Sequence, residues 1–206
     1  MRFFETAPGH GWSSSRGFTA VEVLVVVAII GIVAMMAVPE SSRTMSGMRL
    51  RGDGRNLANA ISLAKMRAGS GNTRTRVAIS PTLRTYVLQV YNRTTNSWQT
   101  EGGTTNLSSG VSFGYGSVAS PPPDTQLTIH QSPQCKDAAG NPIGNTICVL
   151  FNSRGIPITD DTTGSPYGEN GVYITDGTGV YVTTITATPL IRRWWSPANT
   201  TAWVKQ

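Results

Sequence analysis

The chain has 206 residues, of which 39% are hydrophobic and only 14% are charged, with 22 Gly and 12 Pro. This length suits one compact domain and argues against a multidomain enzyme, while the Gly-, Ser- and Thr-rich composition is typical of an exported protein. The formal charge of +6 is uneven, because residues 41–100 hold ten Lys or Arg against Asp53 alone, whereas residues 101–206 hold five against seven acids. The basic character therefore belongs to one stretch of the chain.

An unbroken apolar segment occupies the N-terminal region, with no polar side chain from Val23 to Val38. As a helix, residues 18–38 would span about 31 Å, which is enough to cross a bilayer. A buried core helix is a poor alternative, because the rest of the chain is too small to surround a helix that is apolar on every face. A secretory signal is the other alternative, since Arg16 precedes the segment; however, Ala37-Val38-Pro39 is not a small-x-small cleavage site.

One carboxylate interrupts this apolar pattern and leads to a family resemblance. Glu22 alone at mid-bilayer would cost about 2.5 to 3.5 kcal/mol. The surrounding sequence Arg16-Gly-Phe-Thr-Ala-Val-Glu-Val-Leu24 resembles the class III signal of type IV pilins and type II secretion pseudopilins. The resemblance implies that prepilin peptidase cleaves after Gly17 and methylates the new N-terminal residue, Phe18. It also implies that Glu22 pairs with the N-terminal ammonium of a neighbouring subunit and sets register in a filament. Pro39 resembles the helix-kinking proline of that family.

The charges that flank the apolar segment give a conflicting indication of topology. Arg43, Arg49, Arg51 and Arg55 follow the segment, whereas only Arg2 and Arg16 precede it. The positive-inside rule alone would leave the C-terminal part in the cytoplasm. The family resemblance and the cysteine pair favour the periplasm. We therefore predict a single-pass protein of the bacterial inner membrane with a periplasmic C-terminal domain, which is incorporated into a pilus or pseudopilus.

Beyond Pro39 the sequence predicts an amphipathic continuation of the helix and then short strands. Apolar residues recur three or four apart from Met48 to Ala68, and Gly69-Ser-Gly-Asn72 ends the helix. Strands are predicted at residues 75–79, 85–91, 126–129, 147–151, 171–175 and 180–186. The fold class is α+β and pilin-like, with a long N-terminal helix packed on an antiparallel sheet. The expected divisions are a leader at 1–17, a membrane and assembly helix at 18–39, its amphipathic continuation at 40–72 and a β-rich domain at 73–206.

A second resemblance concerns the globular part of the chain. Leu57-Ala-Asn-Ala-Ile-Ser-Leu-Ala-Lys65 followed by Arg76-Val-Ala-Ile79 resembles the GspH/FimT family, as does Phe151-Asn-Ser-Arg-Gly-Ile156. This resemblance implies a minor subunit of a type II secretion pseudopilus or a type IV pilus. Its expected partners are prepilin peptidase, other pilin or pseudopilin subunits and the inner membrane.

The two cysteines, Cys135 and Cys148, are 13 positions apart and lack the spacing of a zinc or redox centre. A disulfide between them would stabilise the fold by about 3 kcal/mol in the chain-entropy model and would fit an oxidising compartment. Two reduced cysteines, one of them in the strand at 147–151, remain the alternative.

Enzyme chemistry finds little support in the sequence. His10 lies in the predicted leader, and His130, in a predicted strand, is best interpreted as structural; a secreted hydrolase that depends on His130 is the third-ranked alternative. Asp160 and Asp161, with Glu169, offer oxygen ligands for calcium but lack EF-hand spacing, so a solvated acidic turn is favoured. We expect no catalytic residues, no cofactor and no metal.

Basic and aromatic residues near the C-terminus support an alternative function. Arg192, Arg193 and Trp194 combine guanidinium groups with an aromatic ring that could stack on bases. Leu190-Ile-Arg-Arg193 keeps the last Arg of the Gly-Arg-x-Arg motif found in DNA-binding minor pilins of the FimT type. A DNA-binding minor pilin in DNA uptake is therefore the alternative to a purely structural subunit.

Overall fold

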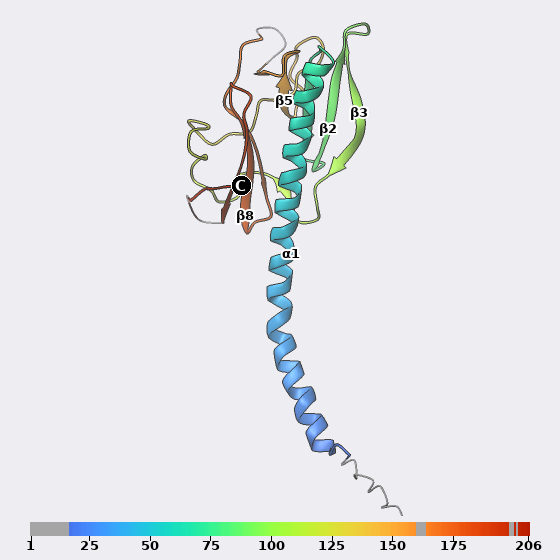
Figure 1. Ribbon diagram of the computed structural model, residues 1–206, viewed down its shortest axis with the longest axis vertical. Coiled ribbons are helices and arrows are strands. Elements are labelled where there is room, and N and C mark those ends of the chain that lie inside the picture. Colours follow the sequence, from blue (N-terminus) through green and yellow to red (C-terminus); the bar gives the residue numbers. More distant parts are fainter. Residues whose placement is uncertain (1–16, 160–163, 198–199, 201) are drawn as a thin grey trace, which may run out of the picture. The chain divides into compact units, whose positions relative to one another are not determined.

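The computed structural model describes residues 17–159, 164–197, 200 and 202–206, without the side chains of residues 36–43. Its one long helix, α1, runs from Ala20 to Ser70 (Figure 1). The chain divides into two compact units, residues 1–42 and residues 43–206, so the C-terminal part of α1 belongs to the second unit. Among the described residues, no helix combines the length and the apolarity needed to cross a membrane.

Helix α1 ends where the sequence predicts. The N–H of Gly71 donates to Arg67 O at 2.9 Å and the N–H of Thr73 donates to Ala68 O at 3.2 Å, which satisfies carbonyls of the last turn. Asn72 has a φ of 44°, in the left-handed region that commonly closes a helix. The backbone then enters the first strand at Thr75, whose hydroxyl donates to Ala64 O at 2.6 Å.

The strands form two antiparallel sheets, where the sequence analysis expected one. The first sheet has the order β3-β2-β1-β5-β6 and the second has the order β10-β9-β8-β7-β4. The first comprises β1 (Thr75–Ser80), β2 (Thr85–Asn92), β3 (Ser97–Asn106), β5 (Ile147–Phe151) and β6 (Pro157–Ile158). The second comprises β4 (Ser112–Phe113), β7 (Asn170–Thr175), β8 (Gly179–Ile185), β9 (Ile191–Pro197) and β10 (Val204–Lys205).

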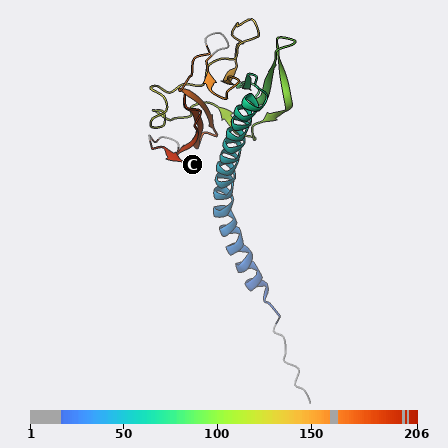
Figure 2. The ribbon, with the colours of Figure 1, turned by 45° about the horizontal axis from the view of Figure 1, so that its top comes forward.

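The C-terminal part of α1 lies between the two sheets, with β2 and β3 on one side and β8 on the other (Figures 1 and 2). Its buried face consists of Leu50, Leu57, Ile61, Ala64 and Ala68, all at most 1% exposed. These side chains form one core cluster with residues of β1, β2, β5, β7 and β8. The predicted amphipathic helix is therefore confirmed, and the predicted α+β class is correct. The apolar face of α1 packs against both sheets.

Two details of the predicted strands are wrong. Residues 126–129 do not form a strand, and His130 does not lie in one. Gln126 is buried there, and its side chain donates to two backbone carbonyls, so a side-chain network replaces a strand ladder. Strands β3, β4, β6, β9 and β10 were not among the predicted strands. The longest of them, β3, is mostly exposed and contains Gly102 and Gly103 in place of an alternating apolar pattern.

Candidate functional site

The segment around the predicted cleavage point begins with a capped helix. Gly17, Phe18 and Thr19 precede the first helical residue, Ala20. The backbone N–H of Glu22 donates to Thr19 Oγ1 at 3.3 Å, so Thr19 is the N-cap of α1. Thr19 and Glu22 have the spacing of a capping box, and this spacing could have identified the cap from the sequence. Both residues lie after Gly17, so cleavage there would leave the cap intact.

Glu22 has no ion-pair partner within the part of the chain that the structure describes. Its position in the first turn places a negative charge near the positive end of the helix dipole, which stabilises the helix modestly. The carboxylate is nevertheless followed by apolar residues only, from Val23 to Val38. A carboxylate in such a setting needs a cationic partner when water is excluded.

The described part of the apolar segment exposes large side chains on every side of the helix. Phe18 and Met35 are both 82% exposed, and each of the described residues between them is exposed. A contiguous apolar surface of this size marks a site of contact with other proteins or with lipid. Pro39 lies within α1, but its side chain is outside the described residues, so its predicted kink stays a prediction.

Comparison with known proteins bears directly on this segment. Residues 12–38 match the family model described as the prokaryotic N-terminal methylation motif. The chain therefore carries an N-terminal methylation motif. The search of curated proteins found no match. Among solved structures, the chain resembles the minor pseudopilin EpsH from the Type 2 Secretion System of Vibrio cholerae, at 10% identity and a TM-score of 0.35, over 77% of this chain and 96% of that one. A likeness of this degree establishes neither function nor subfamily.

Outside this N-terminal segment, the predicted disulfide is confirmed. Cys135 and Cys148 form a disulfide with a Cα–Cα distance of 4.8 Å, and both residues are buried. Backbone hydrogen bonds fix both ends of the enclosed loop: Ile143 N–H donates to Cys135 O at 2.7 Å, and Cys148 N–H donates to Pro133 O at 2.7 Å. The disulfide ties the loop to β5, which contains Cys148.

The three residues predicted to contact DNA do not share one surface. Trp194 is only 8% exposed, its indole N–H donates to Thr184 Oγ1 at 3.1 Å, and it packs in a cluster with Tyr173 and Val182. The expectation that Trp194 stacks on bases is therefore wrong in this structure, because the ring is buried. Side chains alternate along β9, so Arg192 lies on the face of Trp194 and Arg193 lies on the opposite face. DNA binding stays a prediction for these two arginines.

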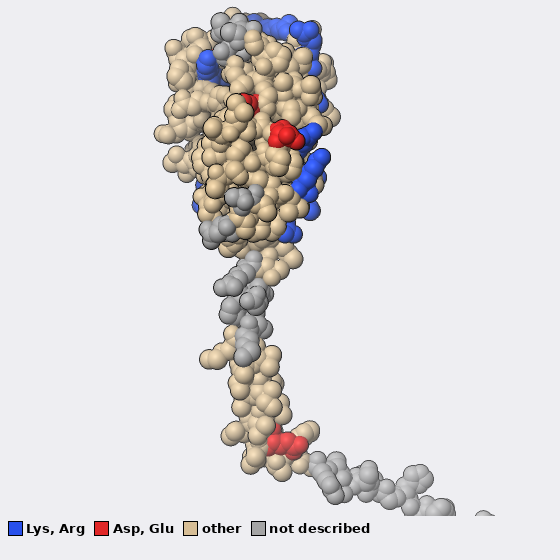
Figure 3. All heavy atoms as spheres, turned by 90° about the vertical axis from the view of Figure 1, so that its left-hand side faces the viewer, with Lys and Arg blue, Asp and Glu red and all other residues tan. Residues whose placement is uncertain are grey.

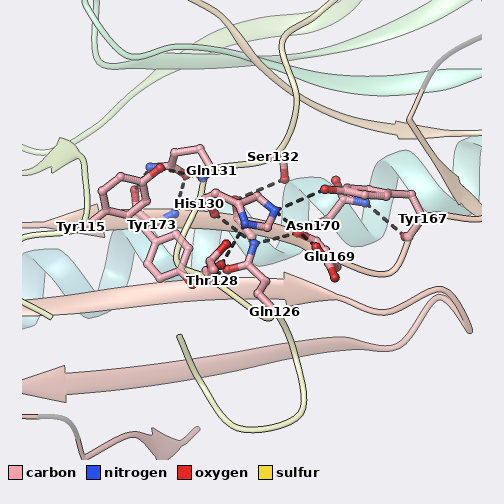
Figure 4. A network of polar contacts seen from close by, with 11 residues as sticks. Tyr115, Gln126, Thr128, His130, Gln131, Ser132, Tyr167, Glu169, Asn170 and Tyr173 are labelled. Carbon is pink, nitrogen blue, oxygen red and sulfur yellow. Dashed lines mark hydrogen bonds and ion pairs between the residues drawn. The ribbon is translucent and has the colours of Figure 1, made fainter. Parts of the chain in front are cut away.

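His130 belongs to a network of polar contacts between residues 126–132 and strand β7 (Figure 4). Its Nδ1 lies 2.9 Å from Thr128 O, and a carbonyl only accepts, so this nitrogen carries the proton. Nε2 lies 3.2 Å from Tyr167 OH and 3.9 Å from Glu169 Oε2. Both ring nitrogens are thus used within the chain, which supports a structural role for His130.

Two glutamine side chains complete this network. The amide of Gln131 accepts from Tyr173 N–H at 2.9 Å and donates to Tyr173 O at 3.1 Å, so it pairs with β7 as a neighbouring strand would. Gln126 donates to His130 O and Glu169 O and accepts from Tyr173 OH at 2.5 Å. Burial raises the pKa of the Tyr173 phenol far above its ordinary value, with a smaller contribution from Tyr115. Sequence patterns did not reveal this network, because it joins residues that are distant in the chain.

No group of three or more potential metal ligands occurs within the described residues. Asp160 and Asp161, the residues considered for calcium, lie outside them. Glu169, considered with them, faces His130 at the edge of the network.

Proposed function

We propose that the chain is a minor pilin or pseudopilin, a structural subunit of a type II secretion pseudopilus or a type IV pilus, rather than an enzyme. In this proposal prepilin peptidase cleaves between Gly17 and Phe18 and methylates Phe18. The observation that carries the proposal is the N-terminal methylation motif at residues 12–38, on a helix whose apolar side chains are exposed on every side. The GspH/FimT subfamily belongs to the same proposal and rests on the sequence resemblance.

The proposed mechanism of assembly uses the one carboxylate of the apolar segment. Glu22 has no cation within the described chain, and cleavage at Gly17 would create a new ammonium on every subunit. Pairing between Glu22 and the ammonium of a neighbouring subunit would neutralise both charges inside an apolar filament core. The cost of burying either charge alone would then select one register between neighbouring helices.

We further propose that the subunit resides in the inner membrane before assembly, anchored by residues 18–39, with its C-terminal unit in the periplasm. The unbroken run of apolar side chains from Val23 to Val38 supports the anchor. The disulfide Cys135–Cys148 supports the periplasm, because disulfides persist in oxidising compartments.

Two substitutions of Glu22 test the assembly mechanism and separate it from helix capping. Glu22→Gln keeps a side chain that suits the capping box but removes the charge, whereas Glu22→Asp keeps the charge. We expect both variants to be cleaved, Glu22→Gln to be lost from sheared filament fractions and Glu22→Asp to retain more incorporation. Val26→Ala serves as a control in the same helix. Normal incorporation of Glu22→Gln would show that the residue only caps the helix and would contradict the charge pair.

A further inference from the structure

Three arginines lie along the seam between the C-terminal part of α1 and strand β9. Arg51 and Arg55 are exposed residues of α1, and Arg193 is a half-buried residue of β9. The guanidinium of Arg51 lies 5.0 Å from the centre of the Trp195 ring. Because side chains alternate along a strand, Arg193 shares the face of Trp195, toward the helix. We call these three residues the basic seam.

The three positive charges converge on one phenol, that of Tyr181 in β8. Burial raises the pKa of Tyr181, while the charges of Arg193, Arg55 and Arg51 partly oppose this rise. Tyr181 is 1% exposed and lies directly under the helix. Gly54, which lies between Arg51 and Arg55 in α1, packs directly against the Tyr181 ring, and Thr183, two residues along β8, pairs with Arg193.

None of the carboxylates that the structure describes pairs with the basic seam. Asp53, the one acid of α1 in this unit, is buried and accepts from Ser108 N–H at 2.8 Å. Glu101 of β3, in the first sheet, pairs with Arg67, whereas β9 belongs to the second sheet. On the face seen in Figure 3, most of the visible Lys and Arg atoms lie along one edge of the C-terminal unit and a few lie on its other side, whereas acidic atoms form only small separate patches. The positive charge of the basic seam is therefore not neutralised by any carboxylate that the structure describes.

Two buried hydroxyl groups beneath the seam also lack partners. Tyr181 OH and Thr183 Oγ1 are inaccessible to solvent and have no hydrogen-bond partner within the described structure. They belong to residues two apart on β8, which share a face, and Thr183 is directly opposite Arg193 in the strand register. Buried hydroxyls are ordinarily hydrogen-bonded, so the region beneath the arginines has unused donors as well as unpaired cations.

We propose that the basic seam is a docking surface for an acidic segment of another protein, whose carboxylate side chains pair with Arg51, Arg55 and Arg193. The guanidinium groups present forked donors that match carboxylates in geometry as well as charge. This role goes beyond the proposed assembly through Glu22, since it concerns the C-terminal unit and requires neither cleavage nor filament formation.

The recessed position of part of the seam favours a protein over a membrane surface or a nucleic acid. A flat bilayer would reach the exposed Arg51 and Arg55, whereas a single side-chain carboxylate can also approach the half-buried Arg193. Single-stranded nucleic acid needs open aromatic faces for stacking, and here the Trp195 ring is covered by Arg51. The basic seam is therefore suited to binding individual carboxylate side chains.

A binding assay on the full chain in a nonionic detergent tests the proposal. A fluorescein-labelled, glutamate-rich peptide is titrated with the protein, and anisotropy gives the affinity. We expect binding that weakens with added salt, because salt screens exposed charges. The triple variant Arg51→Gln, Arg55→Gln, Arg193→Gln should weaken it by about tenfold or more, as the loss of several paired charges at an interface implies. The matched control is Arg49→Gln, Arg84→Gln, Arg154→Gln, which removes the same net charge elsewhere and should bind normally.

Several results would overturn the proposal. Absence of peptide binding at low salt, or equal weakening in the control variant, would show that the seam is not a specific site. Tighter binding to phosphatidylglycerol vesicles or to duplex DNA, abolished by the seam substitutions, would reassign the surface to phosphate groups. If the triple variant unfolds, the three single substitutions are measured instead; each is expected to weaken peptide binding relative to Arg49→Gln, and unchanged affinity in all three would contradict the proposal.

Discussion

Gly54 of α1 lies so close to Tyr181 of β8 that a Cβ atom at position 54 would come within 2.3 Å of Tyr181 Cδ1. Tyr181 is fully buried in the core between helix and sheets, so its ring has little freedom to move away. The absence of a side chain at Gly54 is therefore a condition for the close packing of α1 on the second sheet.

Gly54→Ala should destabilise the C-terminal unit. The new methyl group forces a shift of the Tyr181 ring or of the helix, and overpacking of this kind costs about 1 to 3 kcal/mol. Thermal unfolding of the full chain in detergent measures the change. Gly52→Ala is the control, since a Cβ there meets nothing within 4 Å and Ala favours helix by up to about 1 kcal/mol. Equal melting temperatures of the two variants would contradict the packing account.

The sequence predicted the helix and most central strands because their patterns are local. The apolar spacing from Leu50 to Ala68 identified the buried face of α1, although Met48, the first residue of the predicted face, is 65% exposed. The strand at 147–151 coincides with β5. The sequence pattern could not show that one face of α1 packs against two sheets, because the strands of both sheets contribute the same kinds of apolar residue. Strand β3 is mostly exposed and contains glycines, so its sequence lacks the alternation of apolar and polar residues that predicts a strand.

The N-terminal part of the candidate site was predictable from the sequence, whereas the proposed basic seam was not. The N-terminal motif is contiguous, so Gly17, Phe18 and Glu22 could be located from the sequence alone. The proposed basic seam was not predicted, because Arg193 is distant in sequence from Arg51 and Arg55. The DNA-binding prediction grouped Arg192 and Arg193 as neighbours in sequence, whereas the strand alternation separates them onto opposite faces.

Tyr173→Phe should destabilise the network that holds residues 126–132 against β7. The substitution removes the donor to Gln126 Oε1 and leaves a buried carbonyl oxygen without that partner, which costs about 1 to 3 kcal/mol. The free energy of unfolding is the measurement. Tyr91→Phe is the control, because the hydrogen bond of Tyr91 OH to Asn96 is long and exposed, at 3.4 Å. A Tyr173→Phe variant as stable as the control would show that the network contributes nothing measurable.

Asp137 should titrate below its ordinary pKa of 3.8. Hydrogen bonds from the Asn141 side chain, and then from backbone N–H groups of Asn141 and Ala139, stabilise the ionised carboxylate and lower its pKa. Its contribution to stability is therefore present above 3.8 and is lost as the pH falls through the lowered value. NMR titration of the carboxyl carbon reports the midpoint, and Asn141→Ala should raise it. A midpoint at or above 3.8 in the unmodified chain would refute this.

Cys135 and Cys148 should resist alkylation in freshly isolated native protein until a reductant is added. The disulfide closes a loop with a sequence separation of 13, so replacing both residues with Ser should cost about 3 kcal/mol in the chain-entropy model. Mass shifts after alkylation, with and without reduction, give the result. Free thiols in the native protein would remove the physical support for a periplasmic C-terminal unit.

The most direct test of the proposed function is the intact mass of the protein isolated from its own membranes or filaments, together with its N-terminal sequence. Cleavage by prepilin peptidase predicts a chain of residues 18–206 that begins with N-methylated Phe18 and retains the Thr19 cap of α1. Substitution of Gly17 should leave the uncleaved chain of 206 residues in the membrane fraction. A mature N-terminus at any other residue, or an unmethylated full-length chain in assembled filaments, would contradict the account.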